Sequence, residues 1–239
     1  MKQYYKNNNE KKLFIKEMFD EISPRYNLLN RVLSFGIDVY WRNRFIKYLN
    51  IADNNKILDV ATGTGDIVRH IISKNNVTIV GIDISDQMIK LAKNNIKSNK
   101  SSLEWQVGDA ENLPYLDKSF DIITISFGFR NFTNYDKALS EFNRVLKDGG
   151  KLGILEFSKP NHFFVSKVFN FYFHSILPRV ASIFSKNYAY KYLPESVDNF
   201  ISRNQICSKM ESAGFKSVSC QDLSFGISTI FIGNKINEK

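Results

Sequence analysis

The sequence of 239 residues is poor in cysteine, histidine and proline, with two, three and five of each. Cys207 and Cys220 are too few for a disulfide framework or a cysteine-based metal site. His70, His162 and His174 are scattered and show no metal-ligand spacing. We therefore expect a protein of a reducing compartment whose chemistry needs no metal held by the chain.

Long apolar runs are also missing, since no stretch approaches the roughly 20 apolar residues that a membrane-spanning helix needs. The N-terminus, "MKQYYKNNNEKK", is polar and lacks the apolar core of a secretory signal. A hydrophobic content of 43% with 24% charged residues is typical of soluble globular proteins. We expect a cytoplasmic protein with one full core, organised as a single domain with an extension.

The net charge of +9 is not accompanied by a basic cluster. The lysines are spread along the chain, with no tract of five or six, whereas nucleic-acid binding favours basic residues gathered on one face. We therefore expect no nucleic-acid partner. An excess of lysine can still attract an anionic membrane surface without any motif, so peripheral membrane contact stays open.

The first part of the chain has a helical pattern. Apolar residues recur at helical spacing from about Leu13 to Asn50, after a polar start that we expect to fray. Ser23 and Pro24 predict an N-cap followed by the first residue of a helix, and Asp38 is a candidate cap for another. Residues 1–50 are thus predicted to form a helical N-terminal extension.

The pattern changes at residue 56, where short apolar segments begin to alternate with helical ones. The expected strands are "KILDVA", "VTIVGID", "LEWQVGD", "FDIITISF" and "GKLGILEF", separated by helices over 66–73, 86–98 and 134–146. Such alternation is typical of an α/β domain with a doubly wound, mostly parallel sheet. We assign residues 51–239 to this domain.

The last third of the chain departs from strict alternation. An aromatic helical insertion is expected at about 161–194, followed by one helix over 195–213. "FKSVSCQDL" and "GISTIFIGNK" then predict two strands that pair as an antiparallel hairpin at one edge of the sheet.

The loop after the first strand contains Gly63 and Gly65, which can bring the backbone close to a ligand. A dinucleotide fingerprint requires a third glycine at position 68, where this chain has Val68. A pyrophosphate-binding loop is therefore disfavoured, and a tight turn against a smaller ligand remains.

Acidic residues follow the next two strands. Asp83 lies about 20 residues beyond the glycines, where an acid can accept the hydroxyl groups of a ribose. Asp109 precedes the small residue Ala110 and can accept an adenine amino group. Because ligands bind beyond the carboxyl ends of parallel strands, these residues indicate an adenosine ligand without pyrophosphate. S-adenosyl-L-methionine is the obvious candidate.

Polar residues among aromatic ones follow the fourth strand, in "SFGFRNF". Arg130 and Asn131 can line a pocket for a flat, aromatic substrate. A surface arginine in a turn is the simpler alternative.

These motifs, with "MFDEISPRYNLLNRVLSFGIDVYWR", "LEFSKP" and "YKYLPESVDNF", resemble the ubiquinone/menaquinone biosynthesis C-methyltransferases over about residues 13–234. The resemblance implies a class I S-adenosylmethionine-dependent methyltransferase fold, which is Rossmann-like. Its sheet is expected to have seven strands in the order 3-2-1-4-5-7-6, one of them antiparallel. Cofactor contacts in the family fall on positions matching Thr64, Asp83, Asp109, Ala110 and Ser126.

The resemblance also implies methyl transfer to a ring carbon of a prenylated quinol. We favour demethylmenaquinol as the substrate, while 2-methoxy-6-polyprenyl-1,4-benzoquinol stays open. Arg130, Asn131 and Tyr26 are candidates for stabilising the phenolate or helping to remove its proton, although arginine is too basic to act as a base. The aromatic segment 161–184 is expected to form part of the wall around the isoprenoid tail.

Several alternatives remain at this point. The chain can be a methyltransferase for another small molecule, an RNA methyltransferase, or a non-catalytic scaffold that binds S-adenosylmethionine. A homodimer is compatible with the sequence, which does not give the oligomeric state.

Overall fold

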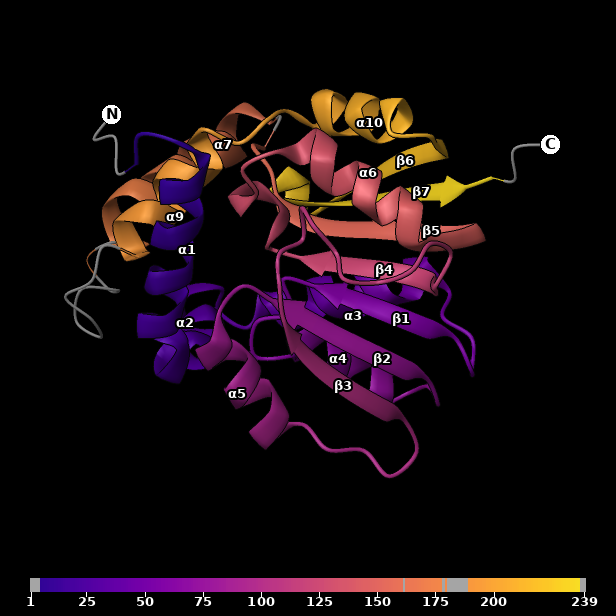
Figure 1. Cartoon of the computed structure of the whole chain (residues 1–239). Helices are drawn as coiled ribbons and strands as arrows, with labels where there is room; N and C mark the ends of the chain where they lie inside the picture. Colours follow the sequence, from indigo (N-terminus) through magenta and orange to yellow (C-terminus); the bar gives the residue numbers. More distant parts are fainter. Residues whose placement is uncertain (1–4, 161, 178, 180–188, 237–239) are drawn as a thin grey trace.

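The computed structural model describes residues 5–160, 162–177, 179 and 189–236 (Figure 1). Its centre is a seven-stranded sheet in the order β3-β2-β1-β4-β5-β7-β6. β7 is antiparallel to β5 and β6, and the other neighbouring strands are parallel. This arrangement confirms both the strand order implied by the resemblance and the edge hairpin. The strands are β1 (Lys56–Val60), β2 (Thr78–Asp83), β3 (Ser102–Val107), β4 (Phe120–Ser126), β5 (Leu146–Phe157), β6 (Phe215–Leu223) and β7 (Ser228–Lys235).

Helices cover both faces of the sheet. α3 (Ile37–Leu49) and α4 (Asp66–Ile72) pack on one face, and α6 (Tyr135–Val145) and α10 (Arg203–Ser212) on the other. α5 (Asp86–Asn95) packs beside β2 and β3. Side-chain caps fix where three of these helices start, because an unpaired N–H in the first turn is costly. Ser85, Asn134 and Ser202 cap α5, α6 and α10 in this way.

The N-terminal helices are α1 (Asn8–Ile22), a 3₁₀ turn (η1, Ser23–Arg25), α2 (Tyr26–Leu33) and α3. α1 begins earlier than expected because the Asn7 side chain accepts the Glu10 N–H at 2.9 Å. The two predicted caps are wrong. Ser23 lies inside the turn and donates its hydroxyl to the Asp20 carbonyl. Gly36, with φ of +76°, caps α3, and Asp38 lies buried in its first turn.

The aromatic segment forms α7 (Phe163–Phe171) and a π-helical turn, η3 (Tyr172–Ile176); residues 161, 178 and 180–184 of the expected segment lie outside the described residues. The expected helix over 195–213 is wrong, because two helices occupy this stretch. α9 (Ala189–Asp198) ends first, and Ser202 then starts α10 through reciprocal hydrogen bonds with Gln205.

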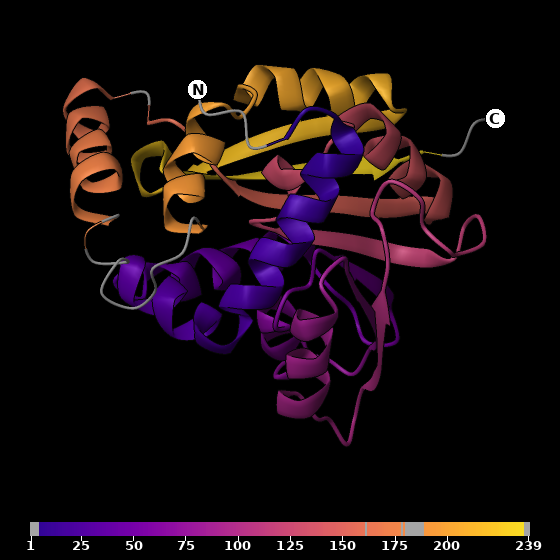
Figure 2. The same cartoon turned by 60° about the vertical axis from the view of Figure 1, so that its left-hand side comes forward.

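α1, α2, α7 and α9 lie together beyond the carboxyl ends of the parallel strands (Figures 1 and 2). Segments far apart in the sequence therefore meet over the edge of the sheet where ligands bind in such folds. None of the helices that the structure describes is long and apolar enough to cross a membrane.

Candidate active site

Gly63 and Gly65, in the loop between β1 and α4, have different structural roles. At Gly65, which has φ of +80°, a Cβ atom would lie 2.3 Å from Ile96 Cδ1 and 2.8 Å from the Trp105 ring. The absence of a side chain there permits close packing. Gly63, with φ of +55°, directs its N–H to the Asp83 carboxylate at 2.8 Å. The loop is thus tied to the end of β2.

Asp83 is buried at the end of β2. One carboxylate oxygen accepts the Gly63 N–H, and the other accepts the Ser85 N–H at 2.9 Å. Burial raises the pKa of Asp83 to about 6, despite these hydrogen bonds. The Ile84 backbone N–H is a third donor to this carboxylate. An ionised carboxylate has about four acceptor positions, so Asp83 retains capacity to accept a hydrogen bond from a ribose hydroxyl group.

Asp59 in β1 supports the same loop and was missed by the sequence reasoning. It accepts hydrogen bonds from Thr62 Oγ1 at 2.5 Å and Thr124 Oγ1 at 2.6 Å, which link the loop to β1 and β4. Burial raises its pKa to about 6. The available signal was a lone acid in the apolar strand "KILDV", because a buried charge needs partners.

The third loop, after β3, is fastened to α1. Lys12 Nζ lies 2.6 Å from Asp109 Oδ2 and 2.8 Å from Glu111 Oε2. Burial acts to raise the pKa of Glu111, but its hydrogen bonds from Lys12 and Thr133 outweigh burial and hold that pKa below its usual value. Sequence reasoning missed Lys12 and Glu111, because a polar helix start gives no sign of its partners.

α1 makes two further polar contacts beyond the carboxyl end of β2. Lys16 Nζ lies 2.6 Å from Asp86 Oδ1, and Asp20 Oδ1 accepts the Ser85 hydroxyl at 2.6 Å. Lys12, Lys16 and Asp20 are spaced by four residues and share one face of α1. The helix therefore lies across the loops that follow β2 and β3.

Two cavities lie beneath these helices. The smaller, of about 80 Å³, is lined by the loops at the strand ends and by α1. The larger, of about 760 Å³, is mainly apolar and lies among α1, α2, α3, α7, η3 and α9. Phe19, Tyr26 and Phe127 line both, so the cavities meet at these three side chains.

The structure places seven of the ten site residues expected from the sequence around the two cavities. Arg130 lines the large cavity, and Tyr26 lines both. Thr64, Gly65 and Ser126 line neither: Thr64 donates its hydroxyl to Asn27, and the buried Ser126 hydroxyl has no partner among the described residues. The members that line the small cavity are Gly63, Asp83, Asp109, Ala110 and Asn131.

Arg130 is held by a buried carboxylate. Its Nη1 donates to Glu156 Oε1 at 2.7 Å and to the Phe127 carbonyl at 2.6 Å, while Nε donates to Ser196 at 3.2 Å. The guanidinium carbon lies 5.4 Å from the Phe157 ring centre. These contacts leave Nη2 without a hydrogen bond to any residue that the structure describes, so two N–H groups remain for a ligand. Glu156, a single acid in the strand "GILEF", was also missed.

Asn131 and Tyr26 have separate environments. Asn131 Oδ1 accepts the Tyr192 hydroxyl at 3.0 Å, which connects the strand-end loop to α9. Burial raises the pKa of Tyr26, so its phenol is protonated at neutral pH and can donate a hydrogen bond. Among the described residues, no group of three His, Cys, Asp or Glu side chains is arranged to hold a metal ion.

A family model described as the ubiE/COQ5 methyltransferase family matches residues 5–235. A ubiquinone/menaquinone biosynthesis C-methyltransferase of Geotalea daltonii is 46% identical, with 92% of this chain and 96% of that protein covered. A demethylmenaquinone methyltransferase of Thermotoga maritima is 44% identical, with coverage of 92% and 95%.

The fold is shared more widely. An S-adenosylmethionine-dependent methyltransferase of Thermotoga maritima superposes with a TM-score of 0.66 at 20% identity, covering 92% of this chain and 99% of that one. This likeness confirms the class of fold. The match along nearly the whole chain and the high identity to curated relatives go further: this chain belongs to the ubiE/COQ5 methyltransferase family.

Proposed function

We propose that the protein transfers a methyl group from S-adenosylmethionine to a ring carbon of demethylmenaquinol, giving menaquinol. The observation that carries this proposal is the meeting of the two cavities at Phe19, Tyr26 and Phe127. One cavity has polar groups suited to a nucleoside, and the other has apolar walls suited to a prenylated ring. Relatives described as a ubiquinone/menaquinone biosynthesis C-methyltransferase and a demethylmenaquinone methyltransferase support the same reaction.

The donor set of the small cavity fits S-adenosylmethionine, which supplies an electrophilic methyl group when bound. Asp83 has acceptor capacity for the ribose, and Asp109 is placed for the adenine amino group beside Ala110. The Gly63 backbone lines the same space. Thr64, Gly65 and Ser126 line neither cavity. We assign them an indirect role in cofactor binding, in which they shape the loops around the small cavity.

The quinol has to lose a proton while its ring carbon attacks the methyl group. Arg130 is assigned to the developing phenolate, because Nη2 keeps two N–H donors and the side chain lines the large cavity. Tyr26 donates a second hydrogen bond from the junction of the cavities. Asn131 positions this loop through Tyr192. Neither Arg130 nor protonated Tyr26 accepts the proton, so we assign that role to water.

The isoprenoid tail is assigned to the large cavity. Leu29 and Leu33 from α2 and Phe169 and Phe173 from α7 and η3 form one apolar cluster along its wall. We propose that the side chains lining this cavity, from the extension 1–50 and from the described part of 161–194, bind the quinol beside the cofactor-binding part of a methyltransferase domain spanning 51–239. The N-terminal helices thereby hold both substrates.

We further propose that the protein works in the cytoplasm, at the inner face of the cytoplasmic membrane. A long prenyl tail partitions into lipid, so the ring has to be collected from a bilayer. The excess of positive charge favours contact with anionic lipid. A homodimer remains the alternative assembly.

The test is the product formed from purified protein, S-adenosylmethionine, and a mixture of short-tailed demethylmenaquinol and the corresponding methoxy-benzoquinol. Mass spectrometry is expected to show one carbon-methylated naphthoquinol. Two methylated products would make the enzyme active on both ring types. Methylated benzoquinol alone, or no product when cofactor binding is confirmed in the same sample, would overturn the proposal.

A further inference from the structure

α2 carries an exposed apolar stripe. The stripe consists of Leu28 and Val32 in the helix and Phe35 in the turn that follows it. These side chains are 57%, 39% and 82% exposed. Their spacing of four and three residues places them along one side, while Leu29 and Leu33 face the cavity wall. The helix is therefore apolar on two sides, and folding of the chain buries one of them.

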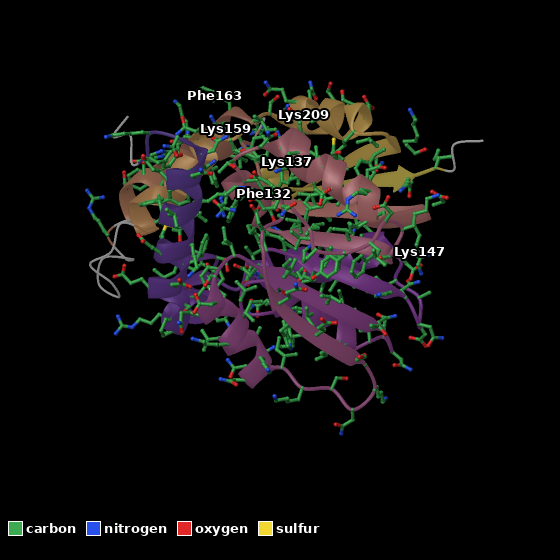
Figure 3. All side chains as sticks on the ribbon, in the orientation of Figure 1. Phe132, Lys137, Lys147, Lys159, Phe163 and Lys209 are labelled. Carbon is green, nitrogen blue, oxygen red and sulfur yellow. The ribbon has the colours of Figure 1, made fainter. Side chains whose placement is uncertain are left out.

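α7 repeats this arrangement. Phe164, Val168 and Phe171 have the same spacing and are 68%, 54% and 63% exposed. Phe169 is buried on the other side of the helix. Phe163, which Figure 3 labels at the start of α7, is also exposed. Helices that are apolar on their solvent side indicate a surface that meets another apolar phase.

Both stripes belong to one face, which we call the α2–α7 face and define by Leu28, Val32, Phe35, Phe163, Phe164, Val168 and Phe171. The Tyr172 hydroxyl donates to the Leu33 carbonyl at 2.6 Å, and the Phe35 and Tyr172 ring centres are 5.7 Å apart. The two helices lie on the same side of the molecule in Figures 1 and 2.

The α2–α7 face is continuous with the large cavity. Phe35, Val168 and Phe171 line that cavity and are also exposed. An apolar path therefore runs from the outside of the molecule to the junction with the cofactor site. Whatever covers the face also covers the entrance to this path.

The two segments that carry the face contain basic residues and no acidic ones. Residues 22–37 contain Arg25 and Arg31 and no acidic residue, and residues 162–177 contain Lys167 and no acidic residue. Two basic side chains of these segments have acidic partners from elsewhere in the chain: Arg31 Nη1 lies 3.1 Å from Asp38 Oδ1, and His174 Nε2 lies 2.8 Å from Asp198 Oδ2. Lys167 Nζ lies 4.4 Å from the Phe163 ring centre. Aromatic side chains with adjoining cations suit the boundary between lipid headgroups and acyl chains.

We propose that the α2–α7 face docks on a bilayer containing anionic phospholipids. This inference rests on the proposed function, because docking places the cavity entrance against the phase that holds the prenyl tail. The apolar side chains enter the headgroup region, and the cations contact lipid phosphates. A second copy of the chain would also cover the stripes, but a symmetric contact would bring the like charges together.

Binding of the full chain to vesicles tests the proposal. The protein is expected to co-sediment with phosphatidylcholine vesicles that contain phosphatidylglycerol, and to bind less to phosphatidylcholine alone or at high salt. Leu28→Ser and Phe164→Ser are each expected to lower the partition constant about tenfold. Lys167→Gln is expected to lower it about fivefold.

Leu116→Ser is the matched control, since Leu116 is 83% exposed in the β3–β4 connection, outside the face. It should leave vesicle binding unchanged. Wild-type protein that stays in solution, or Leu28 and Phe164 variants that bind as wild type does, would overturn the proposal. So would a concentration-dependent dimer that these variants dissociate, with no vesicle binding by the wild type.

Activity separates this inference from the proposed function. Leu28 and Phe164 line neither cavity, so their variants are expected to methylate a short-tailed demethylmenaquinol in solution at the wild-type rate. They should lose activity on a long-tailed quinol presented in vesicles. Wild-type protein that binds vesicles but methylates no quinol would overturn the function and leave the docking face standing.

Discussion

Arg130 Nη1 and Glu156 Oε1 lie 2.7 Å apart in the interior, and the Glu156 side chain is completely buried. Glu156 also accepts the Arg130 backbone N–H at 3.2 Å, so one carboxylate fixes both the side chain and the main chain of Arg130. Such a pair is a weak source of stability, because desolvation offsets most of its attraction. Its effect is to hold the guanidinium in one orientation at the cavity wall.

Glu156→Gln is expected to lower kcat by about tenfold or more, because Arg130 loses the charged partner that orients it. The affinity for S-adenosylmethionine should change little, since Glu156 does not line the small cavity proposed to hold it. Single-turnover kinetics and calorimetry measure the two effects. Glu104→Gln, an exposed change on β3, is the control. Equal losses in kcat and cofactor affinity would contradict a positioning role.

A second substitution of Glu156 tests how much the protein's stability depends on its ion pair with Arg130. Glu156→Ala leaves the guanidinium buried without its carboxylate, so the free energy of unfolding is expected to fall by about 3–5 kcal/mol. Urea titration measures this change. A loss below about 1 kcal/mol would mean that water reaches Arg130 and compensates it.

Lys12→Met is expected to speed release of S-adenosylhomocysteine about fivefold, because it removes the contacts from α1 to Asp109 and Glu111. Stopped-flow displacement measures the rate. Lys137→Met removes an exposed lysine near the middle of the view in Figure 3 and should leave the rate unchanged. Raised salt should affect the wild type more than Lys12→Met. Equal salt effects would show that α1 is not held by these charges.

Cofactor binding is expected to weaken as the pH falls through about 6. Burial raises the pKa of Asp83 to about 6, so its carboxylate becomes protonated below that pH and accepts fewer hydrogen bonds. The dissociation constant of S-adenosylmethionine should rise by up to about tenfold per pH unit below this point. Calorimetry between pH 5 and pH 8 measures it, and a flat profile would exclude Asp83 as the ribose acceptor.

Val165→Trp is expected to raise KM for a long-tailed quinol about tenfold, because Val165 lines the large cavity and indole fills part of it. KM for a short-tailed quinol should stay within about twofold. Ser166→Trp adds the same bulk at a neighbouring position that lines neither cavity. If both variants affect both quinols alike, the tail does not use this cavity.

Much of the fold follows from local pattern. The buried strands are near-continuous apolar runs, and the pairing of β6 with β7 was visible in two strand-like segments joined by a short link. The predicted helix starts were wrong where several nearby residues are suitable N-caps. Ser23, Asp38 and Ser202 are all good caps by residue type, and tertiary contacts determine which of them starts a helix.

The site was predictable where the fold itself places residues at strand ends. Asp83 and Asp109 were expected beyond two neighbouring strands, and both line the small cavity because the carboxyl ends of β2 and β3 are neighbours in the sheet. Their role as cofactor ligands stays a prediction. Lys12 and Glu156 could not be assigned, since their partners lie 97 and 26 residues away in the chain. Such contacts depend on three-dimensional packing and leave no periodic signal in the sequence.

α1 contacts both cavities and can therefore couple the binding of the two ligands. Its N-terminal half contacts the loop at Asp109, and its C-terminal half supplies Phe19, which lines both cavities. A ligand that orders this helix from either end lowers the entropic cost for the other ligand. Linkage is reciprocal, so the factor by which a quinol analogue tightens cofactor binding has to equal the factor by which the cofactor tightens quinol binding. The N-terminal helix thereby gives the two ligands one shared coupling factor, while each keeps its own affinity.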